Sequence, residues 1–251
     1  MTKSGIIIQA RTGSTRLPNK MLLPFYENKG IFEIILQRLK ESPINIPVII
    51  ATTPNESDKR LIEIGNKYGY NYYIGSEENV LRRFIDAATY YRLDNIVRIC
   101  ADNPFLDLNA LDNKIAQIND SFDYWCYAKH NYTPTIKTGF GFWTEVVTLK
   151  ALKKVAISTS EAIFNEHVTN YIYSHPKDFN IHFERINKEI EENADLRLTV
   201  DTKADFDLLK EIYATIVSNK INFSALEISN LVKENPQWLN IMRHETLKNV
   251  K

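Results

Sequence analysis

The stretch GIIIQARTGSTRLPNK, residues 5–20, begins as an apolar run and ends as a loop rich in cations and hydroxyl groups. Three consecutive isoleucines are typical of a buried β-strand. The residues after the strand include a glycine, two hydroxyl residues and three cations: Arg11, Gly13, Ser14, Thr15, Arg16 and Lys20. Glycine permits backbone geometry in which consecutive N–H groups face one anion, and hydroxyl groups and cations strengthen such a site. The loop is therefore predicted to bind phosphate groups, although most short basic loops are solvated surface.

This loop differs from the Walker A loop of many nucleotide-binding enzymes. The Walker A pattern requires a second glycine directly before its lysine. In this chain Pro18 and Asn19 precede Lys20. A phosphate-binding loop of this kind does not name a reaction by itself.

Strands and helices alternate through the first half of the chain. Apolar runs predict strands over residues 5–10, 48–52, 70–75 and 95–102. Helical spacing predicts helices over residues 31–42, 79–92 and from a cap at Asn55 or Ser57 to Gly69. Apolar strands that alternate with helices are typical of an α/β fold, in which an open, mostly parallel sheet carries helices on both faces. The carboxyl ends of parallel strands meet at one edge, where such sheets bind ligands.

That edge is predicted to bring together the phosphate loop, Asp102 and Asp201. The phosphate loop follows the first strand, and Asp102 follows the fourth. Asp201 follows residues 196–200, which alternate like a strand, and the spacing of Thr202 and Asp205 predicts a capping box at a helix start. Taken alone, Asp102 fits a turn residue and Asp201 a helix-start carboxylate. Their occurrence beside a phosphate loop favours a joint site.

The region around residues 121–150 has a different pattern. Aromatic-rich, strand-like segments over 122–132 and 139–147 predict antiparallel additions, a small subdomain or a dimerisation segment. A helix is predicted over residues 160–175. No repeat or linker interrupts the sequence, so residues 1–251 are expected to form a single domain.

The composition limits the partners that we expect. Lys plus Arg number 31 and Asp plus Glu number 31, so no overall basic field attracts nucleic acid or an anionic membrane. Cys100 and Cys126 form no C-x-x-C motif and are interpreted as buried thiols of a reducing compartment. No signal peptide and no run of about 20 apolar residues is present, so the sequence predicts a cytoplasmic protein without a membrane span.

The string QARTGSTRLPNKML resembles the signature loop of the cytidylyltransferases that activate acidic sugars, the CMP-Kdo and CMP-acylneuraminate synthetases. It is most similar to the branch of spore coat polysaccharide biosynthesis protein F. Further segments resemble that branch in the same order: GSEENVLRRF, VRICADNPFLD, NEHVTNYI and LRLTVDTKADFDLL. The resemblance covers most of residues 5–210 and implies the Rossmann-like fold of nucleotide-diphospho-sugar transferases.

The resemblance implies a Mg²⁺-dependent enzyme that joins CMP from CTP to an acidic sugar and releases pyrophosphate for surface glycan biosynthesis. It implies catalytic roles for Arg11, Lys20 and Asp102, and Mg²⁺ coordination by Asp102 and Asp201. The nucleotide-binding residues that it implies are Gln9, Ala10, Arg11, Gly13, Ser14, Thr15, Arg16, Lys20, Asn79 and Arg83. Two carboxylates suit a magnesium ion that also binds phosphate oxygens. Relatives are commonly homodimers, so a homodimer is expected.

The acceptor-binding residues implied by the resemblance are Trp143, Glu145, Glu166 and His167. Trp143 stands where the branch usually has an acidic residue, so this chain is expected to accept a different sugar, or Trp143 belongs to the core. His167 fits a structural role on its helix equally well.

Three functions remain open from the sequence. The first is a cytidylyltransferase, acting on an acidic sugar or alternatively on a sugar phosphate or phosphonate. The second is a glycosyltransferase that uses a nucleotide sugar, which has less need of Lys20 and Asp201. The third is a non-catalytic nucleotide or sugar binder, which the retained carboxylates disfavour.

Overall fold

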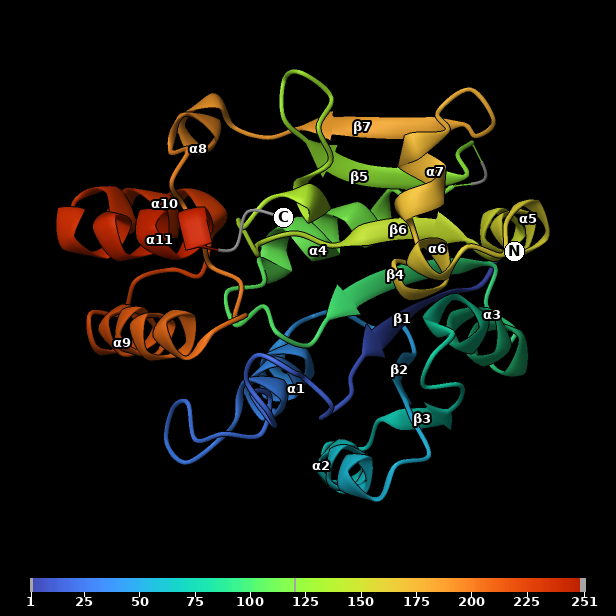
Figure 1. Cartoon of the computed structure of the whole chain (residues 1–251), viewed down its shortest axis with the longest axis horizontal. Helices are drawn as coiled ribbons and strands as arrows, with labels where there is room; N and C mark the ends of the chain where they lie inside the picture. Colours follow the sequence, from blue (N-terminus) through green and yellow to red (C-terminus); the bar gives the residue numbers. More distant parts are fainter. Residues whose placement is uncertain (1, 120, 249–251) are drawn as a thin grey trace.

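The computed structural model describes residues 2–119 and 121–248, and these residues surround one seven-stranded sheet (Figure 1). The strands are β1 Ser4–Gln9, β2 Val48–Thr52, β3 Asn71–Ile74, β4 Asn95–Cys100, β5 Tyr124–Ala128, β6 Glu145–Thr148 and β7 Ile181–Arg185. Their order is β3-β2-β1-β4-β6-β5-β7. Strands β1 to β4 are parallel, and β6 runs antiparallel to both of its neighbours. The predicted open, mostly parallel sheet is confirmed.

Helices cover both faces of this sheet (Figure 1). They are α1 Ile31–Glu41, α2 Lys59–Lys67, α3 Val80–Tyr90, α4 Leu108–Ala116, α5 Leu149–Ser158, α6 Ala162–Glu166, α7 Asn170–Ser174, α8 Lys188–Glu192, α9 Lys203–Ser218, α10 Ala225–Lys233 and α11 Pro236–Lys248, with 3-10 turns η1 Glu56–Asp58 and η2 Thr135–Lys137. Ile6 and Ile8 of β1 pack in the core under α1 and α9, whereas Ile7 packs with α3 and α5. Burial of both faces explains why β1, β2 and β4 are largely apolar runs.

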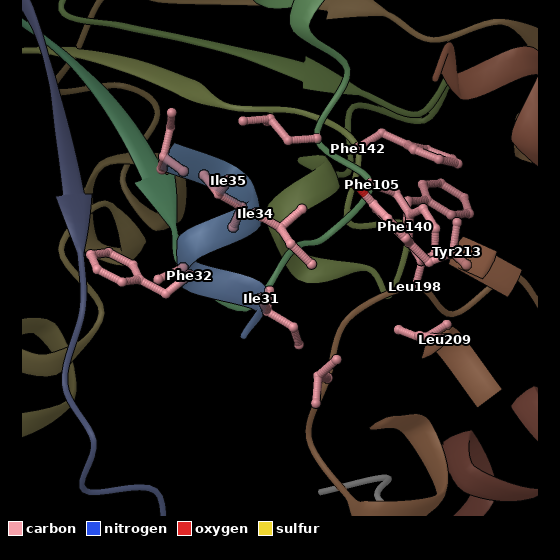
Figure 2. Close-up of a cluster of buried hydrophobic side chains, with 14 of the residues drawn as sticks. Ile31, Phe32, Ile34, Ile35, Phe105, Phe140, Phe142, Leu198, Leu209 and Tyr213 are labelled. Carbon is pink, nitrogen blue, oxygen red and sulfur yellow. The ribbon is translucent and has the colours of Figure 1, made fainter. Parts of the chain in front are cut away.

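The larger core holds the two segments that carry the predicted metal ligands. Figure 2 shows side chains of α1 and α9 meeting Phe105 and Leu198 in one hydrophobic cluster. Phe105 lies just after Asp102, and Leu198 lies just before Asp201. The side chains of Phe105 and Leu198 are both fully buried. The segments that present the two carboxylates are therefore anchored by packing, which restricts their movement.

The antiparallel region expected around residues 121–150 is present as β5 and β6. These strands extend the main sheet between β4 and β7. The capping box at the start of α9 is also confirmed, because Thr202 and Asp205 exchange hydrogen bonds between side chain and backbone. None of the described helices is long and apolar enough to cross a membrane.

The structure differs from the sequence predictions at three elements. The predicted helix over residues 160–175 is broken between α6 and α7, where the Thr169 hydroxyl donates to buried Glu145. Residues 196–200 alternate in burial as predicted but do not pair as a strand. Neither Asn55 nor Ser57 caps α2, which begins after η1. The break between α6 and α7 coincides with a long-range contact that local periodicity does not record.

Candidate active site

A cavity of about 430 Å³ opens at the carboxyl ends of β1 and β4, which point to the same side of the sheet (Figure 1). Its lining residues come from the first strand and loop, from β4, from α6 and from the segment before α9: Gln9, Arg11, Gly13, Ser14, Thr15, Arg16, Lys20, Met21, Arg98, Cys100, Ala101, Asp102, Glu166 and Asp201. The predicted phosphate loop and both predicted metal ligands therefore border one cavity.

The loop between β1 and α1 is fixed by a buried carboxylate that the sequence analysis missed. The backbone N–H and the hydroxyl of Thr12 donate to Asp58 Oδ1 at 2.7 and 2.6 Å, and the Thr53 hydroxyl donates to Asp58 Oδ2 at 2.5 Å. Burial opposes the charge of Asp58, but these hydrogen bonds outweigh it and lower the pKa of the carboxyl group below its ordinary value. Asp58 thus anchors the start of the loop.

The turn itself depends on a different residue from the one expected. The N–H groups of Ser14 and Asn19 both donate to the Thr12 carbonyl, at 2.8 and 3.2 Å. Asn19 has a φ of 56°, in the left-handed region. Gly13 has no positive φ, so the expectation that its backbone freedom shapes the loop is wrong. Asparagine tolerates the left-handed conformation better than most residues with a side chain.

Lys20 joins three segments that are distant in sequence. Its Nζ donates to Asp102 Oδ2 at 2.8 Å and to the Val200 carbonyl at 2.5 Å. The Val200 N–H in turn donates to the Asp102 carbonyl at 3.4 Å. Asp201, the next residue, accepts from Arg16 at 2.5 Å and from Arg197 at 2.9 Å. The phosphate loop thus pairs with both predicted metal ligands.

The donor set fits a magnesium ion better than a metal held by protein alone. Within residues 2–119 and 121–248, no group of three or more His, Cys, Asp or Glu side chains is arranged to hold a metal ion. Asp102 and Asp201 border the same cavity as the phosphate loop. Mg²⁺ commonly binds one or two carboxylates and completes its shell with water and substrate phosphates. The two carboxylates fit such an ion.

The floor of the cavity contains Arg98 of β4, which the sequence analysis also missed. Its Nη1 donates to Glu145 Oε2 at 2.5 Å, and its Nη2 donates to Gln9 Oε1 at 3.1 Å. Glu145 is buried and also accepts from the hydroxyl groups of Thr169 and Tyr124. The available signal was an arginine in the middle of the apolar strand NIVRIC. Glu145 therefore lies beneath the cavity and contacts it through Arg98.

Two further residues that the sequence predicts to bind the nucleotide lie at the start of α3, Asn79 as its N-cap and Arg83 in its first turn. The Asn79 side chain accepts from the Arg82 N–H and caps the helix. Arg83 is fully buried and donates to the Ser76 carbonyl at 2.5 Å, and burial followed by the nearby charge of Arg11 lowers the pKa of Arg83 to about 10. Its Nε and Nη2 have no hydrogen-bond partner in the part of the chain that the structure describes.

The remaining sequence-predicted residues take varied positions. Arg11 and Glu166 both line the cavity and form an ion pair with 3.6 Å between Arg11 Nη2 and Glu166 Oε1. Trp143 packs against Phe140, Phe142 and Tyr127. The other predicted residues are Ala10, which is buried, and His167, which is exposed at the end of α6. Of these residues, Arg11 and Glu166 line the cavity.

The two cysteines also differ from each other. Cys126 is buried as predicted, whereas Cys100 is half-buried and lines the cavity. Burial raises the pKa of the Cys100 thiol to about 11. The thiol is therefore protonated at neutral pH and acts as part of the cavity floor.

A family model described as cytidylyltransferase matches residues 5–231 of the chain. The chain belongs to the cytidylyltransferase family. The family assignment confirms the resemblance drawn from the sequence motifs. This family member is accordingly assigned to the nucleotidyltransferases, in agreement with the phosphate loop and paired carboxylates at the sheet edge.

Individual relatives agree with the cytidylyltransferase assignment. Spore coat polysaccharide biosynthesis protein SpsF of Bacillus subtilis is 34% identical over 235 residues, which cover 92% of this chain and 94% of the relative. A cytidylyltransferase structure from Leptospira borgpetersenii serovar Hardjo-bovis matches with a TM-score of 0.82 and 28% identity, covering 95% of this chain and 97% of that one. CMP:2-keto-3-deoxy-manno-octonic acid synthetase complexed with CTP shares the fold, with a TM-score of 0.64 at 14% identity over 85% of this chain and 99% of that one.

Proposed function

We propose that this protein is a Mg²⁺-dependent cytidylyltransferase that joins CMP from CTP to an acidic sugar and releases pyrophosphate. The observation that carries the proposal is the pairing of Lys20 with Asp102 and of Arg16 with Asp201 in the cavity beside the predicted phosphate loop. These pairs place cations for a triphosphate beside carboxylates for a metal ion. The name of the Bacillus subtilis relative supports a role in polysaccharide biosynthesis.

In the proposed reaction, the loop and its cations bind the triphosphate. Arg11, Arg16 and Lys20 exchange their carboxylate partners for phosphate oxygens, and the hydroxyl groups of Ser14 and Thr15 donate to the same anion. Asp102 and Asp201, released from these pairs, would hold Mg²⁺. When bound, this ion neutralises charge on the phosphate oxygens.

The chemical step itself needs no covalent bond to the protein. A hydroxyl oxygen of the acceptor attacks the α-phosphorus of CTP and loses its proton to solvent, the bond from this phosphorus to the bridging oxygen breaks, and pyrophosphate leaves. Arg11 and Lys20 stabilise the negative charge that develops on the phosphate oxygens, because fixed cations in a partly enclosed site need little reorganisation. Positioning and electrostatics therefore account for the proposed catalysis.

The acceptor is proposed to enter beside Glu166, which lines the cavity opposite Arg11. Glu145 lies below the cavity and reaches it through Arg98, so no direct contact of Glu145 with the acceptor is proposed. Trp143 and His167 would affect acceptor choice from positions around the cavity. We also propose a cytoplasmic homodimer, following the sequence resemblance.

The proposed function is tested first by thermal stabilisation with CTP, UTP, GTP and ATP, each with and without Mg²⁺. A ligand that binds the folded state raises the melting temperature by mass action, so this measurement needs no acceptor. We expect a CTP-selective, Mg²⁺-dependent increase that Asp201→Asn weakens. Asp207→Asn is the matched control, because Asp207 pairs with Lys203 on the exposed side of α9.

A panel of acidic sugars, sugar phosphates and phosphonates then identifies the acceptor by pyrophosphate release. A response to a nucleoside diphosphate or nucleotide sugar, without a response to any triphosphate, would overturn the proposal in favour of a glycosyltransferase. Binding of CTP without pyrophosphate release for any acceptor in the panel would instead indicate a nucleotide binder.

A further inference from the structure

A row of polar side chains crosses four neighbouring strands beneath the cavity. Gln9 of β1, Arg98 of β4, Glu145 of β6 and Tyr124 of β5 are linked in that order by hydrogen bonds. Arg98 and Glu145 stand directly opposite each other in the antiparallel register of β4 and β6. The row therefore follows the strand order of the sheet, β1-β4-β6-β5.

All members of this row lie on one face of the sheet. Successive strand residues point to opposite faces, and Ile7, Ile96 and Val147 belong to the core under α3 and α5. Gln9, Arg98 and Glu145 have the same parity as these residues and so share their face. A polar row on an otherwise apolar face needs a reason, because desolvating charged groups is costly.

The central pair is held by several hydrogen bonds, while the buried Nε of Arg98 has no hydrogen-bond partner within residues 2–119 and 121–248. Glu145 accepts from Arg98, Thr169 and Tyr124. Burial opposes the charge of Arg98, but the neighbouring acidic groups of Cys100 and Glu145 outweigh it and raise the pKa of Arg98 above its ordinary value. Arg98 thus remains a guanidinium cation, which donates hydrogen bonds and never accepts them.

This one-way donation fixes the direction of the Gln9 amide. Because Arg98 can only donate, Gln9 must turn its Oε1 toward Arg98. The Nε2 of Gln9 is then left with its two N–H donors, and it has no protein partner within residues 2–119 and 121–248. Gln9 lines the cavity directly before the phosphate loop.

We propose that the Arg98–Glu145 pair is a positioning device that holds the Gln9 amide with its N–H donors in the cavity, where they bind a hydrogen-bond acceptor atom of the nucleoside part of CTP. Arg98 and Glu145 are positioning residues, and Gln9 makes the contact. This inference rests on the proposed function, because it requires CTP as the ligand.

A double-mutant cycle separates this role from a structural one. The first variant is Gln9→Met, and the second is Arg98→Met/Glu145→Gln, which removes one charge of each sign and leaves the net charge unchanged. The third variant combines all three substitutions. In the second and third, the Tyr124 and Thr169 hydroxyl groups can accept from the new amide, since hydroxyl groups both donate and accept. Gln117→Met, at the exposed end of α4, is the control.

The dissociation constants of CTP and of inorganic tripolyphosphate, each with Mg²⁺, are measured for every variant, together with the melting temperature. We expect Gln9→Met to weaken CTP binding about tenfold while tripolyphosphate binding is retained. The Arg98→Met/Glu145→Gln variant should weaken CTP binding several-fold, and the combined variant no more than Gln9→Met alone, because residues that act through one group are not additive.

Three results would overturn the inference alone. Gln9→Met could bind CTP as tightly as the wild-type protein. The effects of the two sets of substitutions could multiply, which would mean that Arg98 acts independently of Gln9. CTP and tripolyphosphate binding could fall in parallel, as expected from a general distortion of the loop. Wild-type protein that does not bind CTP would overturn the proposed function and this inference together, whereas the first three results leave the proposed function intact.

Discussion

Ion pairs lie in two regions of the cavity. The rim contains the pairs Arg16–Asp201 and Lys20–Asp102, and the floor contains the pair Arg98–Glu145. The two regions differ in burial. At the rim, the Arg16 and Asp201 side chains are 47% and 24% exposed. At the floor, the Arg98 and Glu145 side chains are 8% and 4% exposed. Exposed pairs contribute little net free energy and exchange partners readily. Buried pairs are expensive to break once formed. The rim is therefore suited to release its cations to phosphate, and the floor is suited to hold a fixed shape.

The largest expected effect comes from breaking the floor pair. Glu145→Leu leaves the Arg98 cation buried without its carboxylate, so the free energy of unfolding should fall by about 3–5 kcal/mol. Urea denaturation measures this change. Arg98→Met/Glu145→Gln is the matched control and should recover most of the lost stability. A loss below about 1 kcal/mol would show that the floor is as exchangeable as the rim.

The second-largest expected effect is a loss of catalytic activity on changing a cation at the rim. Lys20→Met removes the cation that bridges Asp102 and Val200, and kcat/KM for pyrophosphate release should drop about 100-fold to 1000-fold. The assay uses the acceptor identified by the panel. Lys29→Met, a change of a lysine outside the cavity, should leave the rate unchanged. An unaltered rate in Lys20→Met would exclude a catalytic role for this rim cation.

The third effect tests the buried anchor of the rim loop. Asp58→Asn retains one acceptor oxygen for Thr12 or Thr53 and should lower the free energy of unfolding by about 1–3 kcal/mol at neutral pH. Because folding lowers the pKa of Asp58 below 3.8, its stabilising contribution is present above that pH and is lost as the pH falls through the folded-state pKa. Between pH 6 and pH 2.5, the free energy of unfolding should therefore fall less steeply with decreasing pH in the variant than in the wild-type protein. Parallel pH dependences in the two proteins would contradict the role of Asp58 as a buried anchor.

The smallest expected effect is at the exposed Arg11–Glu166 pair. Glu166→Gln should change the free energy of unfolding by less than about 0.5 kcal/mol. Removing this negative charge from the cavity should tighten CTP binding a few-fold at low ionic strength, and added salt should reduce the difference. Titrations at two salt concentrations check this. A salt-independent loss of CTP binding would mean that Glu166 contacts the nucleotide directly.

The sequence predicted the first half of the fold better than the second. Strands β1, β2 and β4 are buried on both faces, so their apolar runs are unambiguous, whereas the edge strand β3 is largely exposed. Residues 196–200 show the opposite case. They alternate in burial like a strand, yet their backbone forms isolated hydrogen bonds, such as those to the carbonyl groups of Gly139 and Asp102, in place of a ladder with a neighbouring strand. Alternation records which side is buried and does not record whether a neighbouring strand is available.

The site shows the same division. Strand direction was sufficient to predict that Lys20 and Asp102 share one edge, because they follow the parallel strands β1 and β4. Asp201 was predicted there from a strand over residues 196–200 that does not form, and hydrogen bonds of Val200 to Lys20 and Asp102 place this segment at the edge instead. Asp58 was missed because its partners, Thr12 and Thr53, carry no local signature of a buried carboxylate. Glu145 was expected in contact with the acceptor, but it lies below Arg98, since a cross-strand register decides which side chains meet.

By itself, the sequence determined the class of fold and the family, because these follow from periodicity and from contiguous motifs, and it predicts the phosphate-binding loop. Only the tertiary structure decided that Asp58 anchors the loop, that Asn19 and not Gly13 takes the left-handed conformation, and that Arg98 donates to Gln9 Oε1. The physical reason is that hydrogen-bond partners and buried charges are set by contacts between segments far apart in the chain.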